Sequence, residues 1–406
     1  MLLIPSRSYR APDFMSAARK LGIDVVVAAD AEHPLQESDS GKQLTLNFSN
    51  VEISTDRIED FDDRFPLRSI VAVDDAGARV AASASRRLEL PHNPVRAVDA
   101  TRDKALLRQA LAASDVPSPA FRAIPTTADP NDEWASLPFP VVLKPLALSA
   151  SRGVIRANNK DEFYAAFERI RDILALPANA DECGDTADRI LIEGYLPGAE
   201  VAVEGLLLGG KLNVLAVFDK PDPLEGPFFE ETIYITPSRL PAEDLELVIK
   251  TSERACAALG LTDGPTHLEL RLNEDGAFPI DIAARSVGGL CSRTLTFGTG
   301  LSLEELILRQ ALGEEPGDLS RSAGAAGVMM IPIPGRGRLT SVSGVDKAEA
   351  VPFVDSVSIT MPPGSSLTPL PEGSEYLGFI FARDQDPDVV EQALRLAHGE
   401  LSFDID

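Results

Sequence analysis

The feature that most limits how this chain can fold is a repeating pattern at residues 267–283, which read HLELRLNEDGAFPIDIA. Apolar and polar residues alternate on both sides of Glu274-Asp275-Gly276, where Gly276 suits the left-handed position of a three-residue turn. Pairing the two halves about Asp275 collects the apolar residues on one face, with Leu272 opposite Phe278, Leu270 opposite Ile280 and Leu268 opposite Ile282. The pattern therefore predicts a β-hairpin with one apolar face.

The same pairing puts two carboxylates, Glu269 and Asp281, directly opposite each other on the other face. Carboxylates about 5 Å apart across a ladder repel, so something has to compensate their charge. A magnesium ion does this best, because hard cations prefer carboxylate oxygens. The hairpin alone leaves two alternatives open, a solvated acidic pair and neutralisation by Arg271 or Arg285.

Length and charge limit the class of protein. A chain of 406 residues with 44% apolar content is expected to form two or three domains. The net charge of −25 argues against a nucleic acid partner but leaves a nucleotide open. We find no apolar run of about 18 residues, so no membrane span is predicted. Three cysteines without CxxC spacing indicate neither a disulfide framework nor a zinc site, and a cytoplasmic location is expected (Cys183, Cys256 and Cys291).

The first 95 residues alternate between strand-like and helix-like segments, which predicts a Rossmann-like α/β domain with a small parallel sheet. The expected strands are Leu2–Ile4, Ile23–Ala28 and Ser69–Val73, and the expected helix is Ala11–Leu21. The apolar start of the chain is short and is expected to be a buried strand, not a signal peptide. Residues 5–8 contain no glycine, so the dinucleotide-binding fingerprint is missing.

The remaining chain predicts a mixture of α/β and α+β structure in two further parts. After a linker at 91–94, Thr101 is expected to cap a helix over 101–114, and 126–137 is expected to be a polar loop. Further helices are expected at 160–174, 242–259, 303–312 and 388–398, with a mobile acidic loop at 178–188. From about residue 316 the composition favours short strands, which indicates a small β-rich unit.

Two segments in the middle of the chain favour a nucleotide. The strand at 139–145 ends at Lys144 and leads into a small-residue loop at 149–153, where backbone N–H groups can close over a phosphate. A solvated strand edge is the alternative. Farther on, Glu193 and Glu200 flank a turn at Pro197-Gly198; exposed backbone at 193–196 suits adenine and Glu200 suits ribose hydroxyls. An ordinary hairpin with surface glutamates is the alternative there.

The order of these features resembles the ATP-grasp superfamily from about Arg102 to Leu312. The resemblance implies three parts: a Rossmann-like domain at 1–95, a catalytic region at 96–315 with a lid at about 117–200, and a small β-rich domain at 316–406. It implies ATP and Mg²⁺ as cofactors, with Mn²⁺ as an alternative ion. The implied phosphate and lid residues are Lys104, Lys144, Ser149, Ser151 and Gly153; the adenine and ribose residues are Glu193, Tyr195, Leu196 and Glu200; the metal ligands are Glu269 and Asp281. Ala283 stands where many members have a further asparagine ligand, so the number of ions stays open.

Within the superfamily, four segments are similar to the L-amino-acid ligases that make dipeptides such as bacilysin: FDKP at 218–221, EETIYITPS at 230–238, THLEL at 266–270 and DIAARSVGG at 281–289. The resemblance implies that Glu231 and Arg285 hold an amino acid, and that Lys220, Arg285 and Gly288 serve catalysis. Tyr234 stands where the family has a histidine that helps to select the amino acid. Arg285 paired with Asp281 or Glu269 is the purely structural alternative.

The function that these resemblances imply is an ATP-dependent ligase. It joins a small-molecule carboxylate to an amine through an acyl phosphate and releases ADP and phosphate, with no nucleic acid or membrane partner and a homodimer as one expected assembly. Two alternatives stay open. One is an ATP-grasp carboxylase or a formate-using, purine-type ligase, and the other is a nucleotide-binding protein without turnover.

Overall fold

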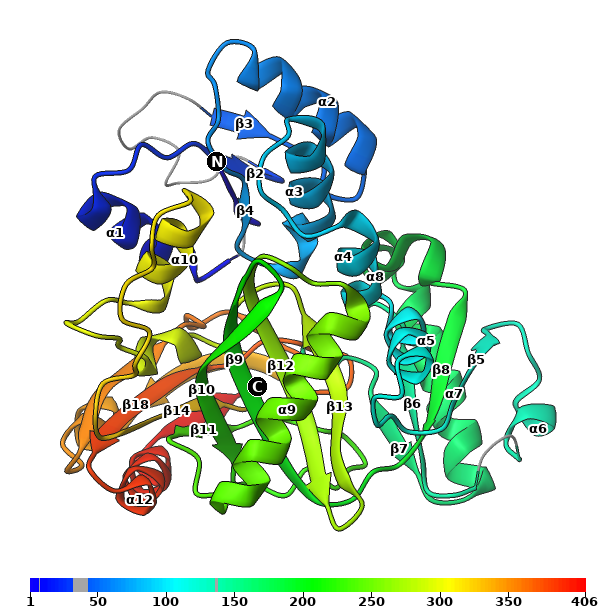
Figure 1. Ribbon diagram of the computed structural model, residues 1–406. Coiled ribbons are helices and arrows are strands. Elements are labelled where there is room, and N and C mark those ends of the chain that lie inside the picture. The colour runs from blue at the N-terminus through cyan, green and yellow to red at the C-terminus, as the bar shows by residue number, and fades with distance from the viewer. Residues whose placement is uncertain (7, 32–42, 136–137) are drawn as a thin grey trace.

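The computed structural model describes residues 1–6, 8–31, 43–135 and 138–406 (Figure 1). Its N-terminal part is a four-stranded parallel sheet in the order β3-β2-β1-β4, drawn at the top of Figure 1. The strands are β1 (Leu2–Leu3), β2 (Val27–Ala29), β3 (Gln43–Thr45) and β4 (Val71–Ala72); the helices are α1 (Ala11–Leu21), α2 (Val51–Asp62) and α3 (Asp75–Arg87). The predicted parallel sheet and the predicted bounds of α1 are confirmed, although the strands are shorter than expected.

Two helices, α4 (Val95–Arg102) and α5 (Lys104–Ala113), replace the single helix predicted for 101–114. Asp103 lies between them with extended backbone, and its carboxylate accepts hydrogen bonds from the N–H groups of Ala105 and Leu106. The predicted cap, Thr101, lies inside α4 and its hydroxyl donates to the carbonyl of Val98. The prediction was wrong because aspartate is a stronger N-cap residue than threonine. The predicted helix is therefore interrupted at Asp103, and α5 begins directly after it.

A second, antiparallel sheet in the order β5-β8-β6-β7 lies on the right of Figure 1 and packs against α7. Its elements are β5 (Phe121–Pro125), α6 (Pro130–Glu133), β6 (Val141–Pro145), β7 (Ile155–Ala157), α7 (Lys160–Ala175), α8 (Pro177–Cys183) and β8 (Arg189–Gly194). The loop predicted for 178–188 is mostly helix α8 and a short 3-10 turn at Gly184–Thr186. Pro177 starts α8, and the buried Asn179 side chain donates to the carbonyl of Ile173, so polar composition misled that prediction. The polar segment 126–137 contains the short helix α6, and residues 136–137 lie outside the described part of the chain.

The largest sheet is antiparallel, with eight strands in the order β13-β12-β9-β10-β11-β14-β18-β16. Its strands are β9 (Ala199–Leu208), β10 (Lys211–Lys220), β11 (Ile233–Thr236), β12 (Gly264–Asn273), β13 (Gly276–Ala283), β14 (Ala325–Ile331), β16 (Val354–Ile359) and β18 (Gly378–Asp384). Strands from the β-rich tail therefore continue the central sheet. Three further tail strands form a small sheet of their own, β17 (Ser366–Leu367), β15 (Gly337–Ser343) and β19 (Ser402–Ile405). Helix α11 (Val345–Glu349) packs against β16 and α12.

The two faces of the large sheet differ. Helices α9 (Ala242–Leu259) and α12 (Pro387–Gly399) cover one face, where Val217, Leu268 and Ile235 are buried. Residues one position along the same strands point the other way, and that face carries Glu200, Glu204 and Glu269. Helix α10 (Leu303–Ala311) connects this second face to α1 of the N-terminal part.

The hairpin β12–β13 confirms the two predicted pairs nearest the cavity and corrects the rest. Leu268 faces Ile282 and Glu269 faces Asp281, but Leu270 faces Pro279 and Leu272 faces Ala277. Ile280 is the extra residue of a β-bulge, and Gly276 pairs with Asn273, so the turn has two residues and not three. The buried Arg108 of α5 explains the bulge, because its guanidinium takes the carbonyls of Pro279 (2.9 Å) and Ile280 (2.7 Å).

Strands β8 and β9 belong to different sheets, so the ordinary hairpin considered for 190–208 is wrong. The connection at 195–198 crosses from one sheet to the other, and Gly198 approaches β12 closely at a φ of +115°. A Cβ there would lie 2.1 Å from the carbonyl oxygen of Leu272. The crossing leaves a space between the two sheets, which the functional site uses.

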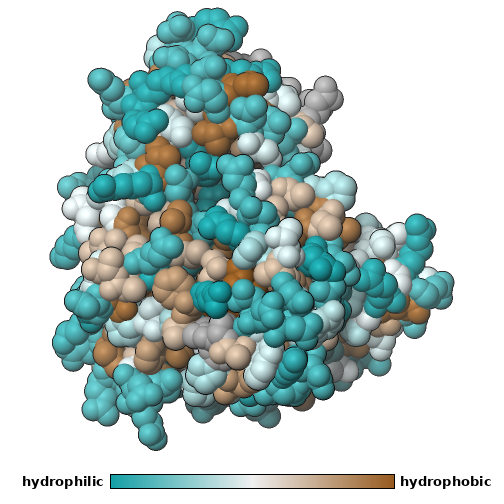
Figure 2. Space-filling model, turned by 90° about the vertical axis from the view of Figure 1, so that its right-hand side faces the viewer, coloured by the Kyte–Doolittle hydropathy of each residue, from teal (hydrophilic) through white to brown (hydrophobic). Residues whose placement is uncertain are grey.

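The described helices contain none that is long and apolar enough to cross a membrane. The face shown in Figure 2 is largely hydrophilic, with apolar residues interspersed among hydrophilic ones.

Candidate active site

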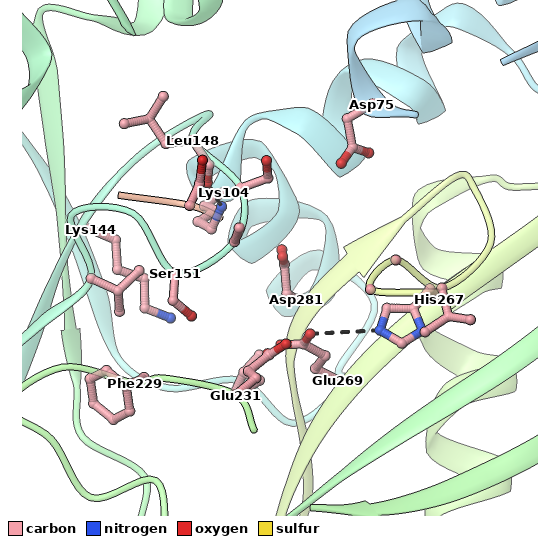
Figure 3. Close-up of a pocket in the computed structure, with 18 of the residues that line it drawn as sticks. Asp75, Lys104, Lys144, Leu148, Ser151, Phe229, Glu231, His267, Glu269 and Asp281 are labelled. Carbon is pink, nitrogen blue, oxygen red and sulfur yellow. Dashed lines mark hydrogen bonds and ion pairs between the residues drawn. The ribbon is translucent and has the colours of Figure 1, made fainter. Parts of the chain in front are cut away.

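A cavity of about 460 Å³ lies where the N-terminal part, the β5–β8 sheet and the large sheet meet (Figure 3). Most of the predicted site residues line it: Lys104, Lys144, Ser149, Ser151, Glu193, Tyr195, Leu196, Glu200, Glu231, Tyr234, Glu269, Asp281, Arg285 and Gly288. Two predicted residues do not line it. Gly153 lies at the end of the lid loop, and Lys220 lies behind the glutamates. Residues far apart in sequence thus share one cavity.

Two lysines form the wall next to the β5–β8 sheet. Lys104, the first residue of α5, donates from Nζ to the carbonyl of Leu148 at 3.0 Å. Lys144, in β6, is paired with Glu193 at 2.7 Å, and Arg108 holds the other oxygen of Glu193 at 2.6 Å. Burial raises the pKa of Glu193, but Arg108 and Lys144 outweigh it and hold that pKa at about 2. Glu193 is therefore a fixed carboxylate that orients Lys144.

The segment after Glu193 was predicted to be an adenine hinge, and its backbone is anchored on both sides. Gly194 donates its N–H to the carbonyl of Ala120, and Tyr195 donates to that of Pro140. The Arg156 guanidinium lies 4.0 Å from the centre of the Tyr195 ring. Leu196 follows and lines the cavity.

The loop at 149–153 is tightly built. Ala150, Ser151 and Gly153 all have positive φ angles, of 54°, 53° and 68°. A Cβ on Gly153 would lie 2.6 Å from Cγ of Pro145, so only glycine fits without a shift. Ser149 and Ser151 face the cavity, whereas the Gly153 N–H donates to the carbonyl of Pro371 at 2.9 Å.

Three glutamates converge on Lys220 at the centre of the large sheet. The Nζ of Lys220 lies 2.7 Å from Glu200, 2.8 Å from Glu231 and 3.4 Å from Glu269. Burial lowers the pKa of Lys220, but the three carboxylates outweigh it and raise that pKa well above its ordinary value. Arg271 holds the second oxygen of Glu200 at 2.7 Å and also donates to the carbonyls of Gly198 and Leu224.

The donor set fits a divalent cation. Glu200, Glu231 and Glu269 each offer an oxygen within 4.8 Å of the others. Asp281 pairs with Glu269 in the ladder and lines the same cavity. The three glutamates and Asp281 outnumber the two cationic side chains that pair with the glutamates, Lys220 and Arg271. The imidazole of His267 also lies close to Glu269. Burial and the neighbouring Glu269 raise the pKa of Glu231, which reflects this crowding of negative charge. Lys220 lies farther from Glu269 (3.4 Å) than from Glu200 and Glu231, so Glu269 is the glutamate whose charge it neutralises least and the one best suited to bind an ion.

Two residues that sequence reasoning missed, His267 and Glu204, support this wall from behind. His267 Nδ1 lies 3.3 Å from Glu204, and its Nε2 lies 3.7 Å from Glu269, as the dashed line in Figure 3 marks. Glu204 also accepts the N–H of Val287 and so connects the sheet to the 285–289 loop. The signal was available, since His267, Glu269 and Arg271 are the polar members of the same alternating strand.

The remaining wall joins the large sheet to the N-terminal part. Arg285 is paired with Asp75, the first residue of α3, with both Nε (3.1 Å) and Nη2 (3.0 Å) contacting Oδ2. The structural alternatives for Arg285, pairing with Asp281 or Glu269, are therefore wrong. Tyr234 donates its hydroxyl to Glu231 at 2.9 Å, and both residues line the cavity. Gly288 lies in the same wall, next to Gly289, whose N–H donates to the Tyr9 hydroxyl.

Three family models match successive parts of the chain: the ATP-grasp N-terminal domain at 15–92, the ATP-grasp domain at 137–294 and the L-amino acid ligase C-terminal domain 2 at 329–406. With the antiparallel sheets, the lysines and the carboxylates described above, they define the class. The chain belongs to the ATP-grasp superfamily and is an ATP-dependent ligase that forms carbon–nitrogen bonds. Within that class it resembles the L-amino-acid ligases.

Individual relatives agree with this placement. The crystal structure of L-amino acid ligase from Bacillus licheniformis superposes with a TM-score of 0.86 at 26% identity, covering 100% of this chain and 98% of that one. An alanine–anticapsin ligase of Bacillus subtilis is 29% identical over 56% of this chain and 50% of its own length, so the match spans about half of that relative. An uncharacterized protein of Sinorhizobium fredii is 23% identical over 99% of this chain and 83% of its own length.

Proposed function

We propose that this chain activates the carboxylate of an amino acid as an acyl phosphate and joins it to the amine of a second small molecule. ATP is converted to ADP and phosphate. The observation that carries the proposal is one cavity lined by two buried lysines, a crowded carboxylate wall and the side chains of Glu231 and Arg285. The alanine–anticapsin ligase and L-amino acid ligase relatives support amino acids as the substrate class.

The nucleotide end has the chemistry for γ-phosphoryl transfer. Lys104 and Lys144 are proposed to neutralise the phosphates, with Ser149, Ser151 and Gly153 closing over them. The segment Glu193, Tyr195 and Leu196 is proposed to receive adenine, and Glu200 the ribose. Glu269 and Asp281 would hold a magnesium ion, with Mn²⁺ as an alternative, and the ion would supply positive charge for phosphoryl transfer.

The substrate end has two opposite charges. Glu231 suits the ammonium of an amino acid, and the planar fork of Arg285 suits a carboxylate or the oxyanion that forms when the amine attacks. Gly288 leaves room for a backbone approach in the same wall. Lys220 pairs with Glu200, Glu231 and Glu269, so we propose that its role is to orient these three carboxylates.

The experiment is a screen of ADP release over pairs of amino acids, with mass spectrometry of the products. We expect ADP, phosphate and an amide in equal amounts for the best pair. Formation of AMP and pyrophosphate, measured by ion-exchange chromatography, contradicts the acyl-phosphate route. Bicarbonate or formate as the only carboxylate that supports ADP release would instead favour the carboxylase or purine-type alternative.

The division into segments 1–95, 96–315 and 316–406, with a lid at about 117–200, is likewise proposed for this chain. A homodimer and a cytoplasmic location stay predictions.

A further inference from the structure

Two loops reach the lid from the opposite side of the cavity. The first runs from β10 to β11, where the Pro227 carbonyl accepts the N–H of Arg156 at 2.9 Å and Phe228 pairs with Ile155 of β7. The second runs from β17 to β18, where the Pro371 carbonyl accepts the N–H of Gly153. Both loops therefore contact the strand and turn that close over the proposed phosphate site.

One lid residue, Arg169 of α7, contacts both loops at once. Its Nε and Nη2 lie 2.7 and 3.1 Å from the two carboxylate oxygens of Glu372, a two-point contact. Its guanidinium carbon lies 4.9 Å from the centre of the Phe228 ring, in the range of a cation–π contact. The hydrogen bond from Arg169 lowers the pKa of Glu372, so that carboxylate stays charged at neutral pH.

Each loop enters the cavity within two residues of its contact with Arg169. Phe229, next to Phe228, lines the cavity, and so does Glu231 two residues farther on. Ser374, two residues after Glu372, also lines it, and so does Tyr376 two residues farther on. Arg169 is therefore connected through two short stretches of chain to two walls of the cavity.

We propose that Arg169 is a positioning residue that holds the lid and both loops closed over the acyl phosphate, so that the amine and not water attacks it. This inference rests on the proposed function. When water attacks, the acyl phosphate returns the free carboxylate and phosphate, one ATP is spent and no amide forms. An open lid therefore raises the amount of ADP released per amide.

The first test is Arg169→Gln, which removes the charge and keeps the length of the side chain. The pair with Glu372 is partly exposed, so we expect the ratio of ADP to amide to rise about threefold. Arg171→Gln is the matched control, because Arg171 lies on the same helix and pairs only with the neighbouring Glu168 among the described contacts. It should keep the wild-type ratio. Glu372→Gln should raise the ratio as Arg169→Gln does, and the double variant should be no worse than either single one.

A second measurement needs no known amino acid. Hydrogen exchange at residues 149–157 should slow when Mg-ATP is added to the wild type and to Arg171→Gln, and much less so in Arg169→Gln. Equal protection in all three, or an unchanged ratio of ADP to amide, overturns the role of Arg169. Failure of the wild type to make an amide from any pair overturns the proposed function instead, and the exchange experiment still decides the role of Arg169.

Discussion

At the scale of single residues, Glu193 is a buried carboxylate whose two oxygens are shared between Arg108 and Lys144. Its pKa of about 2 lies below the ordinary 4.5, so it stabilises the fold above pH 4.5 and loses that contribution as the pH falls toward 2. A pKa shift of this size contributes on the order of 3 kcal/mol to the free energy of unfolding. Glu193→Gln should lose about that much at neutral pH, and its difference from the wild type should shrink below pH 4.5.

Urea unfolding between pH 7 and pH 3 measures this difference. Glu246→Gln is the control, because Glu246 pairs with Lys250 on the exposed surface, where solvent screens the pair, and the change should leave stability almost unaltered. A constant difference between Glu193→Gln and the wild type across the whole pH range would contradict the shifted pKa.

Tyr234 is the residue at which the sequence departs from the ligases that it resembles. Its hydroxyl donates to Glu231, and the Nζ of Lys220 lies 5.0 Å from the centre of its ring. Tyr234→Phe removes one donor from the proposed ammonium site, and Tyr234→His changes its size and polarity. We expect both to change the ranking of kcat/KM among amino acids, whereas Arg285→Lys should lower kcat/KM for all of them. An unchanged ranking of kcat/KM in a panel of amino acids would show that Tyr234 contributes to packing and not to substrate selection.

The residues that could be predicted from the sequence are those whose neighbours are set by local geometry. Glu269 and Asp281 face each other because one hairpin contains both. Asp75, the partner of Arg285, comes from a helix 210 positions earlier, and no local pattern connects the two. Arg108 was missed for the same reason, since its three partners lie in β8 and β13.

At the scale of elements, the hairpin β12–β13 brings two like charges together at the proposed ion site. Without metal, Asp281→Asn relieves this repulsion and should leave the melting temperature equal to or above that of the wild type. Glu269→Gln also gives up the contacts with Lys220 and His267, which lower the pKa of Glu269, so it should lower the melting temperature. With substrates, both variants should lose nearly all activity, and more magnesium should not restore it. Thermal melts with and without magnesium separate the two effects; near-normal turnover in either variant rules out the ion site at this pair.

The lid loop allows a sharper test of backbone geometry. Gly153→Ala forces a Cβ against the Pro145 ring at a positive φ, so the loop has to shift. We expect a loss of about 1–3 kcal/mol in local stability and a raised KM for ATP. Gly184→Ala is the control, because Gly184 also has a positive φ but has open space around it and lies outside the cavity. Equal KM values for the two variants would show that strain at 153 does not reach the nucleotide.

Elements with strong periodicity were predicted closely, as α1 and α9 illustrate, because their apolar stripes and glycine ends are local signals. The break between α4 and α5 was misplaced, since it depends on one carboxylate capping the second helix. The bulge at Ile280 could not be predicted, because Arg108 reaches it from another element. Helix α8 was also missed, because its polar composition is typical of a loop. Its Asn179 side chain donates to the carbonyl of Ile173 in the neighbouring helix α7, a contact that the sequence does not reveal.

At the scale of the whole molecule, the order of weak motifs along the chain predicted the fold better than any single motif. The parts that meet at the cavity come from three sheets, and the contacts between them are long-range ion pairs and buried arginines. Arg10, for example, is buried and donates to the carbonyls of Val73 and Ser286. Such contacts join parts that are far apart in sequence, which is why no local pattern predicted them.

The pair Asp75–Arg285 gives the clearest test that the N-terminal part completes the site. Burial raises the pKa of Asp75, but Arg285 and Arg102 outweigh it and lower that pKa, so Asp75 is charged at neutral pH. Asp75→Asn keeps the shape and frees Arg285 to move, and kcat should fall about tenfold or more while the affinity for ADP changes little. Asp13→Asn is the matched control, because Asp13 makes a similar two-point pair with Arg293 between the same parts, away from the cavity. Steady-state kinetics and ADP titration of both variants test this prediction. Equal losses in kcat would mean that Asp75 only helps to attach the N-terminal part to the rest of the chain and does not orient Arg285.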